Sequence, residues 1–220
     1  MSLEVIEFES APNPTASIII LHGLGADGND FVPIAQELDL ASVGPVRFVF
    51  PGAPTRPVTI NGGYLMRAWY DILGTEVARR EDEAGLRASQ AQIEALIANE
   101  RARSVKANRI VLAGFSQGCA MTFMAGLRHG ERLAGLLGMS GYLPLADLTA
   151  TERSAANADV PIFQAHGSAD PMITMARATA SRDALIALGY PVEWHAYPMP
   201  HSVCPQEIVD MNRWLLRVLA

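Results

Sequence analysis

A serine between two glycines is the first group in this sequence that could do chemistry. Residues 114–118 (GFSQG) have the spacing G-x-S-x-G, which places a serine on a sharp turn between a strand and a helix. A buried strand pattern at residues 110–113 runs into this turn, and a helical pattern begins at Gln117. Such a reversal strains the serine backbone and directs its hydroxyl to solvent, beside the amides that begin a helix. The context favours Ser116 as a nucleophile over the alternative of an ordinary glycine-rich turn.

A base and an acid for this serine follow later in the chain. A serine hydroxyl needs a base within hydrogen-bond reach, and folds with this turn supply Asp or Glu first and His after it. Asp170 follows a strand pattern at residues 161–165, and His201 follows another at residues 192–197. Both residues are therefore expected at the edge of an α/β sheet where ligands bind. We expect Ser116, Asp170 and His201 to form a catalytic triad.

The other histidines and two aspartates fit these roles less well. Each histidine either precedes the expected acid, lies within a strand or ends a helix, so structural roles are predicted for them. The aspartates do not directly follow a buried strand. These residues are His22, His129, His166, His195, Asp147 and Asp159.

A second glycine-rich turn could supply an oxyanion site. Residues 22–25 (HGLG) follow the buried strand pattern of residues 17–21. Acyl transfer builds negative charge on the carbonyl oxygen, and preorganised backbone N–H groups stabilise that charge. We expect the backbone amides of Leu24 and Gln117 to donate to it, since Gln117 directly follows the nucleophile. This chemistry requires no metal ion and no cofactor, and none is predicted.

The composition narrows the class of protein. The chain has 220 residues, of which 50% are hydrophobic, and a net charge of −6. An acidic chain without a basic stripe is not expected to bind nucleic acid. No apolar run reaches signal-peptide length or the roughly 18 residues of a membrane span, so a cytoplasmic protein without integral membrane association is predicted. Two cysteines, Cys119 and Cys204, do not make a disulfide framework.

Short strand patterns alternate with longer helical patterns along the chain, which predicts an α/β fold with a mostly parallel central sheet flanked by helices. We find no linker, so residues 1–220 are expected to form a single domain. The expected strands cover residues 17–21, 46–50, 109–113, 133–139, 161–165 and 192–197, and the expected helices cover residues 82–101, 117–128, 174–188 and 205–218.

One long connection, near residues 52–74, does not fit this alternation. It contains prolines, paired glycines and an apolar, aromatic stretch at residues 64–73. Long connections in compact domains are usually functional or disordered, and this one is too apolar for disorder. It is expected either to fold back into the core or to act as a lid or acyl-pocket wall. It could also bury itself against a second copy, so a homodimer is one alternative.

Several segments together resemble the phospholipase/carboxylesterase group of α/β-hydrolases, which includes acyl-protein thioesterases and small bacterial carboxylesterases. The resemblance runs from about residue 17 to the C-terminus. The matching segments are residues 21–28 (LHGLGADG), 51–54 (PGAP), 69–72 (WYDI), 81–85 (EDEAG) and 114–118 (GFSQG), His166-Gly167 with Asp170-Pro171, and residues 201–205 (HSVCP).

The resemblance implies the same triad and oxyanion donors, and it implies that residues 62–72 form an acyl-pocket loop. Leu65, Trp69, Met172 and Val203 are accordingly expected to contact substrate. The chain departs from the family pattern at Cys119, at residues 66–68 (MRA) and at Pro200. Cys119 is expected to leave less space for packing behind the turn that carries Ser116. The other two departures are expected to change the shape of the acyl pocket.

These features together predict a serine carboxylic-ester hydrolase that forms an acyl-enzyme on short- to medium-chain esters or thioesters. One alternative is an acyl-protein thioesterase or lysophospholipase that removes long acyl chains from an acylated protein or a lysophospholipid. A peptidase on the same fold and a non-catalytic ligand binder are also possible readings of the same residues.

Overall fold

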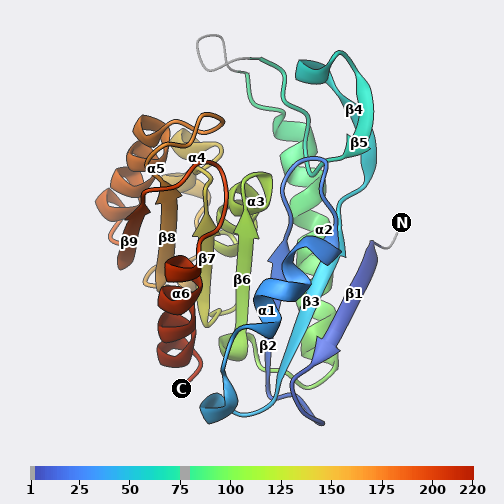
Figure 1. Cartoon of the computed structure of the whole chain (residues 1–220), viewed down its shortest axis with the longest axis vertical. Helices are drawn as coiled ribbons and strands as arrows, with labels where there is room; N and C mark the ends of the chain where they lie inside the picture. The colour runs from blue at the N-terminus through green and yellow to red at the C-terminus, as the bar shows by residue number, and fades with distance from the viewer. Residues whose placement is uncertain (1–2, 75–79) are drawn as a thin grey trace.

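A seven-stranded sheet forms the centre of the molecule, in the order β1-β3-β2-β6-β7-β8-β9 (Figure 1). The computed structural model describes residues 3–74 and 80–220. Neighbouring strands are parallel except for β1, which pairs antiparallel with β3. The mostly parallel sheet expected from the sequence is therefore confirmed. The strands are β1 (Glu4–Glu9), β2 (Ala16–Leu21), β3 (Val46–Gly52), β6 (Ile110–Phe115), β7 (Gly135–Met139), β8 (Ile162–Gly167) and β9 (Val192–Tyr197).

Helices cover both faces of this sheet. Successive strand side chains point to opposite faces, so Ile18 of β2 packs with α1 and α6 while Ile19 packs with α2 and α3. In Figure 1, α1 and α6 lie in front of the sheet. None of the helices in residues 3–74 and 80–220 is long and apolar enough to cross a membrane. The helices are α1 (Val32–Gln36), α2 (Glu83–Ala102), α3 (Gln117–Gly126), α4 (Ala146–Glu152), α5 (Met175–Ala187) and α6 (Pro205–Val218).

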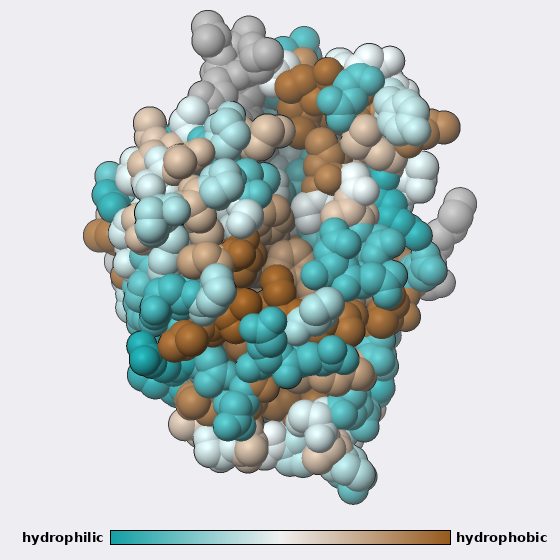
Figure 2. All heavy atoms as spheres, viewed as in Figure 1, coloured by the Kyte–Doolittle hydropathy of each residue, from teal (hydrophilic) through white to brown (hydrophobic). Residues whose placement is uncertain are grey.

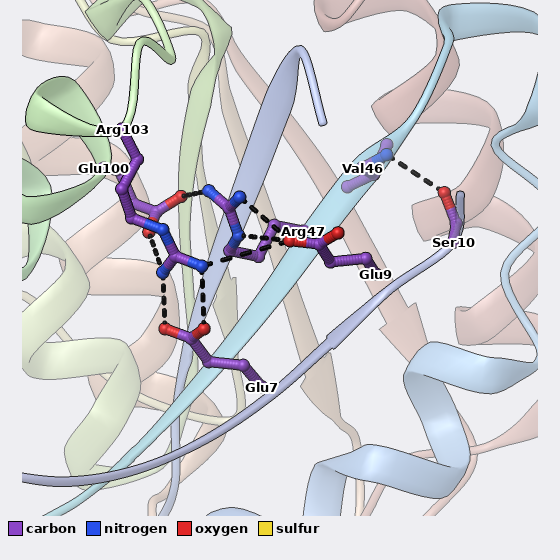
Figure 3. Close-up of polar contacts among 7 residues, drawn as sticks. All are labelled: Glu7, Glu9, Ser10, Val46, Arg47, Glu100 and Arg103. Carbon is purple, nitrogen blue, oxygen red and sulfur yellow. Dashed lines mark hydrogen bonds and ion pairs between the residues drawn. The ribbon is translucent and has the colours of Figure 1, made fainter. Parts of the chain in front are cut away.

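Strand β1 was not predicted from the sequence. Three glutamates interrupt its three apolar residues, so the sequence of this segment has no clear strand pattern. In the structure, charges hold this edge strand in place (Figure 3). Arg47 of β3 pairs with Glu9 of β1 at 2.9 Å and with Glu100 of α2 at 2.8 Å. Arg103 joins Glu100 to Glu7 of β1, which completes a network between strand and helix.

The long connection forms a hairpin and then enters the core. Strands β4 (Thr55–Val58) and β5 (Tyr64–Arg67) pair antiparallel and carry exposed apolar side chains, including Tyr64 and Leu65. The chain then turns inward, and Trp69 and Tyr70 are buried. The part of the segment that holds Trp69 and Tyr70 therefore folds back into the core, which is one of the two expectations for it.

The sheet order creates a topological switch point beside β2. Chain connections leave β2 toward β3 on one side, while β6 lies on its other side. The turns after β2 and β6 therefore open next to each other at the carboxyl edge, where α/β sheets bind ligands. Residues 22–25 and Ser116 lie in these two turns.

Candidate active site

Ser116 occupies a strained turn between β6 and α3. Its φ of 56° and ψ of −115° lie in a region that residues with a side chain rarely adopt. The backbone N–H of Ser116 donates to the carbonyl oxygen of Met139 at 2.9 Å, which ties the turn to the end of β7. The strained elbow expected from the G-x-S-x-G spacing is therefore present.

The glycines of this turn allow a helix to pass very close to a strand. A Cβ atom on Gly118 would lie 2.0 Å from the carbonyl oxygen of Leu21, and one on Gly114 would lie 2.2 Å from that of Gly118. A Cβ on Gly23 would lie 3.3 Å from the Cβ of Ser116. The turn after β2 thus packs directly against the serine because glycines occupy these positions.

Asp170 and His201 lie together at the same edge of the sheet. The Nδ1 atom of His201 lies 2.7 Å from Oδ2 of Asp170. The other carboxylate oxygen accepts the backbone N–H groups of Met172 at 2.8 Å and Ile173 at 2.9 Å. This arrangement orients the imidazole with Nδ1 toward the acid, which leaves Nε2 as its other nitrogen for proton transfer. The ring of Phe115 packs against His201 with centroids 4.7 Å apart.

A cavity of about 680 Å³ is lined by two of the three triad candidates. Its wall includes Ser116 and His201 together with Leu24 and Gln117, the two expected oxyanion donors. Figure 2 shows a hollow between the β4–β5 part of the molecule and the α5 side, with hydrophobic residues gathered along it. The apolar part of the wall includes Phe31, Ile34, Ile60, Ile72, Ile173 and the two predicted substrate contacts Met172 and Val203.

The other two predicted substrate contacts lie outside this cavity wall. Trp69 has no exposed surface, and its indole Nε1 donates to the carbonyl oxygen of His22 at 2.9 Å. Leu65 is 63% exposed on the β4–β5 hairpin. The sequence alone does not show that Trp69 is buried and Leu65 exposed, because both residues are apolar and belong to the same long connection.

Side chains behind the cavity hold the two turns that carry the expected oxyanion donors. The Nε2 atom of His22 accepts the backbone N–H of Ala53 at 2.9 Å, and its Nδ1 lies 2.6 Å from the carbonyl oxygen of Gly23. Burial lowers the pKa of His22, which favours the neutral ring that this pattern requires. The Gln117 side chain accepts from the N–H of Trp69 at 3.0 Å and donates to the carbonyl oxygen of Tyr70 at 2.9 Å.

The remaining histidines make contacts that suit structural roles. His166 lies 2.8 Å from the carbonyl oxygen of Ile173 through Nε2, and so supports the loop that carries Asp170. His129 lies 2.6 Å from Glu94. His195 stacks between Phe163 and Tyr197. Within residues 3–74 and 80–220, no group of His, Cys, Asp or Glu side chains is placed to hold a metal ion.

The structure shows the surroundings of Cys119, Arg67 and Pro200, where the chain departs from the family pattern. Cys119 is fully buried behind the elbow, and Cβ atoms on Gly138 and Gly141 would lie 2.7 and 2.6 Å from its sulfur. Burial also raises the pKa of the Cys119 thiol, which makes it unreactive. Arg67 turns away from the cavity and pairs with Glu4 at 2.6 Å, so it ties the hairpin to β1. Pro200 packs its carbonyl against Gly167, where a Cβ would lie 2.4 Å away.

The sequence analysis did not identify four polar or charged residues of the cavity wall, namely Asp30, Asn61, Tyr142 and Arg177. They belong to no motif, and the elements that carry them gave no chemical signal.

The profile of the phospholipase/carboxylesterase family matches residues 2–219. The chain belongs to this family. It is 40% identical to acyl-protein thioesterase 1 of Yarrowia lipolytica over 206 residues, which cover 91% of each protein. It is also 40% identical to acyl-protein thioesterase 1 of Mycosarcoma maydis, over 98% of this chain and 96% of the relative.

Solved structures agree with the family assignment. Acyl-protein thioesterase 2 of Zea mays superposes with a TM-score of 0.85 at 28% identity, over 98% of this chain and 99% of the other. Arabidopsis thaliana SOBER1 superposes with a TM-score of 0.88 at 28% identity, over 93% of this chain and 99% of the other. The chain therefore has the α/β-hydrolase fold and is a serine hydrolase of the phospholipase/carboxylesterase family.

Proposed function

We propose that this family member is a thioesterase that removes long acyl chains from acylated proteins, with Ser116, His201 and Asp170 as its triad. The observation that carries the proposal is the cavity of about 680 Å³, in which an apolar wall adjoins Ser116 and His201. Such a wall suits a flexible hydrocarbon chain. The fungal relatives named acyl-protein thioesterase 1 support the same substrate class. This reverses the order of preference from the sequence, which favoured shorter chains.

The proposed reaction uses these side chains as follows. His201 accepts the Ser116 proton through Nε2 while the serine oxygen attacks the acyl carbon, and Asp170 holds the imidazole through Nδ1. The backbone N–H groups of Leu24 and Gln117 donate to the oxyanion. The imidazolium then protonates the leaving thiolate, and an acyl-enzyme remains. Water, activated by the same imidazole, releases the fatty acid and regenerates Ser116.

A second candidate is the same reaction on short- to medium-chain esters. The polar side chains Asp30, Asn61 and Arg177 interrupt the apolar wall of the cavity, which favours shorter acyl groups. A lysophospholipid would share the long acyl chain of the first candidate but carry an oxygen ester.

A chain-length series separates these candidates. S-acyl thioesters and p-nitrophenyl esters with two to sixteen carbons would be compared by kcat/KM. We expect the thioester maximum beyond about eight carbons, because each buried methylene adds about 0.8 kcal/mol of transfer free energy. A maximum at two to four carbons would support the second candidate instead.

Two further assays distinguish a thioesterase from a ligand binder and from a peptidase. A fluorophosphonate probe should label the wild type and leave Ser116→Ala unlabelled; absence of labelling in both would favour a ligand binder. Amide substrates with the same acyl groups should react far more slowly than thioesters, and comparable rates would indicate a peptidase.

A further inference from the structure

Arg177 is a cation in the wall of the active-site cavity. It lies in the first turn of α5, and its guanidinium carbon is 3.2 Å from the centroid of the Tyr142 ring, which lines the same cavity. Throughout the described part of the chain, no carboxylate lies within ion-pair distance of this guanidinium. Most other arginines differ in this respect; Arg182 of the same helix, for example, pairs with Asp183 at 2.7 Å.

A chain of contacts connects Arg177 to the reaction centre. The hydroxyl of Tyr142 hydrogen-bonds to the hydroxyl of Tyr70. The carbonyl oxygen of Tyr70 accepts from the side chain of Gln117, whose backbone N–H is an expected oxyanion donor. Because stacking uses the flat face of a guanidinium, its N–H groups stay available in the plane for a second partner.

The charges on the cavity wall are arranged with opposite signs on either side of Ser116. Asp30 lies in the segment after β2, and Arg177 lies in the helix after β8. Strand β6, which leads into Ser116, lies between β2 and β8 in the sheet. An anion is therefore repelled on the Asp30 side and attracted on the Arg177 side.

We propose that Arg177 binds an oxyanion, a carboxylate or a phosphate, on the leaving-group half of the substrate. This rests on the proposed hydrolysis of acyl esters or thioesters. The acyl half is hydrocarbon and is matched by the apolar wall, so it offers nothing to pair with a guanidinium. A planar guanidinium suits both oxyanions, because it donates two parallel N–H groups to two oxygen atoms. Arg177 is thus a specificity residue that selects acidic leaving groups.

Matched pairs of substrates test this proposal. The carboxylate pair is the S-octanoyl thioester of 3-mercaptopropionate and that of its methyl ester. The phosphate pair is 1-octanoylglycerol 3-phosphate and 1-octanoylglycerol. In at least one pair, the wild type should favour the anionic member by about tenfold or more in kcat/KM, as expected for a charge-assisted hydrogen bond. The pair with the larger ratio identifies the oxyanion.

Arg177→Gln should remove this preference. We expect KM for the anionic member to rise with kcat nearly unchanged, because the lost contact is made in both the ground and transition states. Arg177→Gln should hydrolyse the neutral member of each pair at the wild-type rate. This rate also shows that the variant is folded. Arg177→Lys should keep part of the preference, since it keeps the charge without the planar fork.

Two further variants and a change of salt concentration test the role of charge. Arg182→Gln removes an arginine from the same helix that stacks on Trp194 at 5.0 Å, outside the cavity wall, and should leave the ratio unchanged. Asp30→Asn should raise the ratio, because it removes the opposing charge. High salt should lower the wild-type ratio by screening.

Equal rates for both members of each pair in the wild type would overturn the proposal, as would a preference that survives in Arg177→Gln. Failure of the thioesterase proposal gives a different result. In that case both thioesters would react slowly, while the ratio would still be measurable on the oxygen-ester pair.

Discussion

Ser116 combines a strained backbone with a position between two glycine-rich turns. Its φ of 56° is maintained because β6, α3 and the turn after β2 pack around it. Strain of this kind persists only where the surrounding structure imposes it. The consequence is a hydroxyl held at the cavity wall, close to the amides that begin α3.

Replacing this hydroxyl gives the most direct prediction at the residue scale. Ser116→Ala should lower kcat by about a million-fold, as when a triad serine is lost elsewhere. The measurement is hydrolysis of p-nitrophenyl octanoate by the purified variant. Ser168→Ala, an exposed serine on the loop that carries Asp170, is the matched control and should stay within about twofold of wild type. Activity of Ser116→Ala within tenfold of the control would rule out this nucleophile.

A buried acid in α6 gives a prediction about stability and pH. Glu207 is fully buried, and desolvation raises its pKa to about 8. An unfolded glutamate has a pKa of about 4.3. Between these values the folded protein retains a proton that the unfolded chain has released, so the free energy of unfolding falls as pH rises from about 4.3 to about 8. Above about 8 this contribution is constant.

Glu207→Gln should remove this part of the pH dependence. Urea unfolding of wild type and variant would be compared between pH 5 and pH 8. The variant should gain stability relative to wild type by up to roughly 1.4 kcal/mol for each pH unit in that window. If the free energies of unfolding of wild type and variant changed equally with pH, the raised pKa of Glu207 would be contradicted.

At the scale of elements, the close passage of α3 over β2 positions the two proposed oxyanion donors, the backbone amides of Leu24 and Gln117. This passage depends on Gly118, where a Cβ would meet the carbonyl oxygen of Leu21 at 2.0 Å. The same contact brings the N-terminus of α3 beside residues 22–25. Helix and strand therefore cannot separate without moving the Gln117 and Leu24 amides apart.

Gly118→Ala tests this dependence. The added methyl must push α3 away from β2, so we expect a loss of about 1–3 kcal/mol in the free energy of unfolding. A fall in kcat should accompany it, because the Gln117 amide moves. Gly130→Ala is the control, since a Cβ there meets nothing within 4 Å, and it should change neither quantity. A Gly118→Ala variant with normal kcat would show that the amide position does not depend on this contact.

At the scale of the whole molecule, charge holds the N-terminal strand to the distant helix α2. Arg47 is nearly buried, and its partner Glu100 is almost completely buried. Removing one member of a buried pair leaves the other without its counter-charge, which is more destabilising than losing a surface pair. Arg103 still contacts Glu100 and limits the loss.

Arg47→Met should therefore lower the free energy of unfolding by roughly 2–4 kcal/mol, with kcat of the folded protein unchanged. Arg87→Met removes an arginine of α2 from two more exposed ion pairs, one with Glu83 of the same helix and one with Glu152 of α4, and should cost under about 1 kcal/mol. Both values come from urea unfolding at pH 7. Equal losses in the two variants would mean that the network of Figure 3 adds little to stability.

The parts of this protein that depend on local sequence pattern can be predicted from the amino-acid sequence alone. Apolar strand runs and helical periodicity located β2, β3, β6, β8, β9 and the long helices, because a buried strand or an amphipathic helix must repeat its apolar residues. Strand β7 was expected from its position along the chain, since its glycine and leucine content leaves its periodicity undecided. The order of Ser116, Asp170 and His201, and the turn at residues 22–25, could be read because each follows a strand end. Parallel strands bring such ends to one edge.

Features that depend on residues far apart in the chain cannot be predicted in this way and are seen only in the folded molecule. Strand β1 pairs with β3 next to Arg47 and Arg103, whose positive charges compensate the glutamates of a segment that looks like a polar terminus, while Glu100 holds the two arginines in place. Trp69 is placed in the core and Leu65 on the surface, although both are apolar. Arg177 faces the cavity because of where α5 packs. Burial and charge pairing are properties of surroundings, and these surroundings exist only once distant segments have come together.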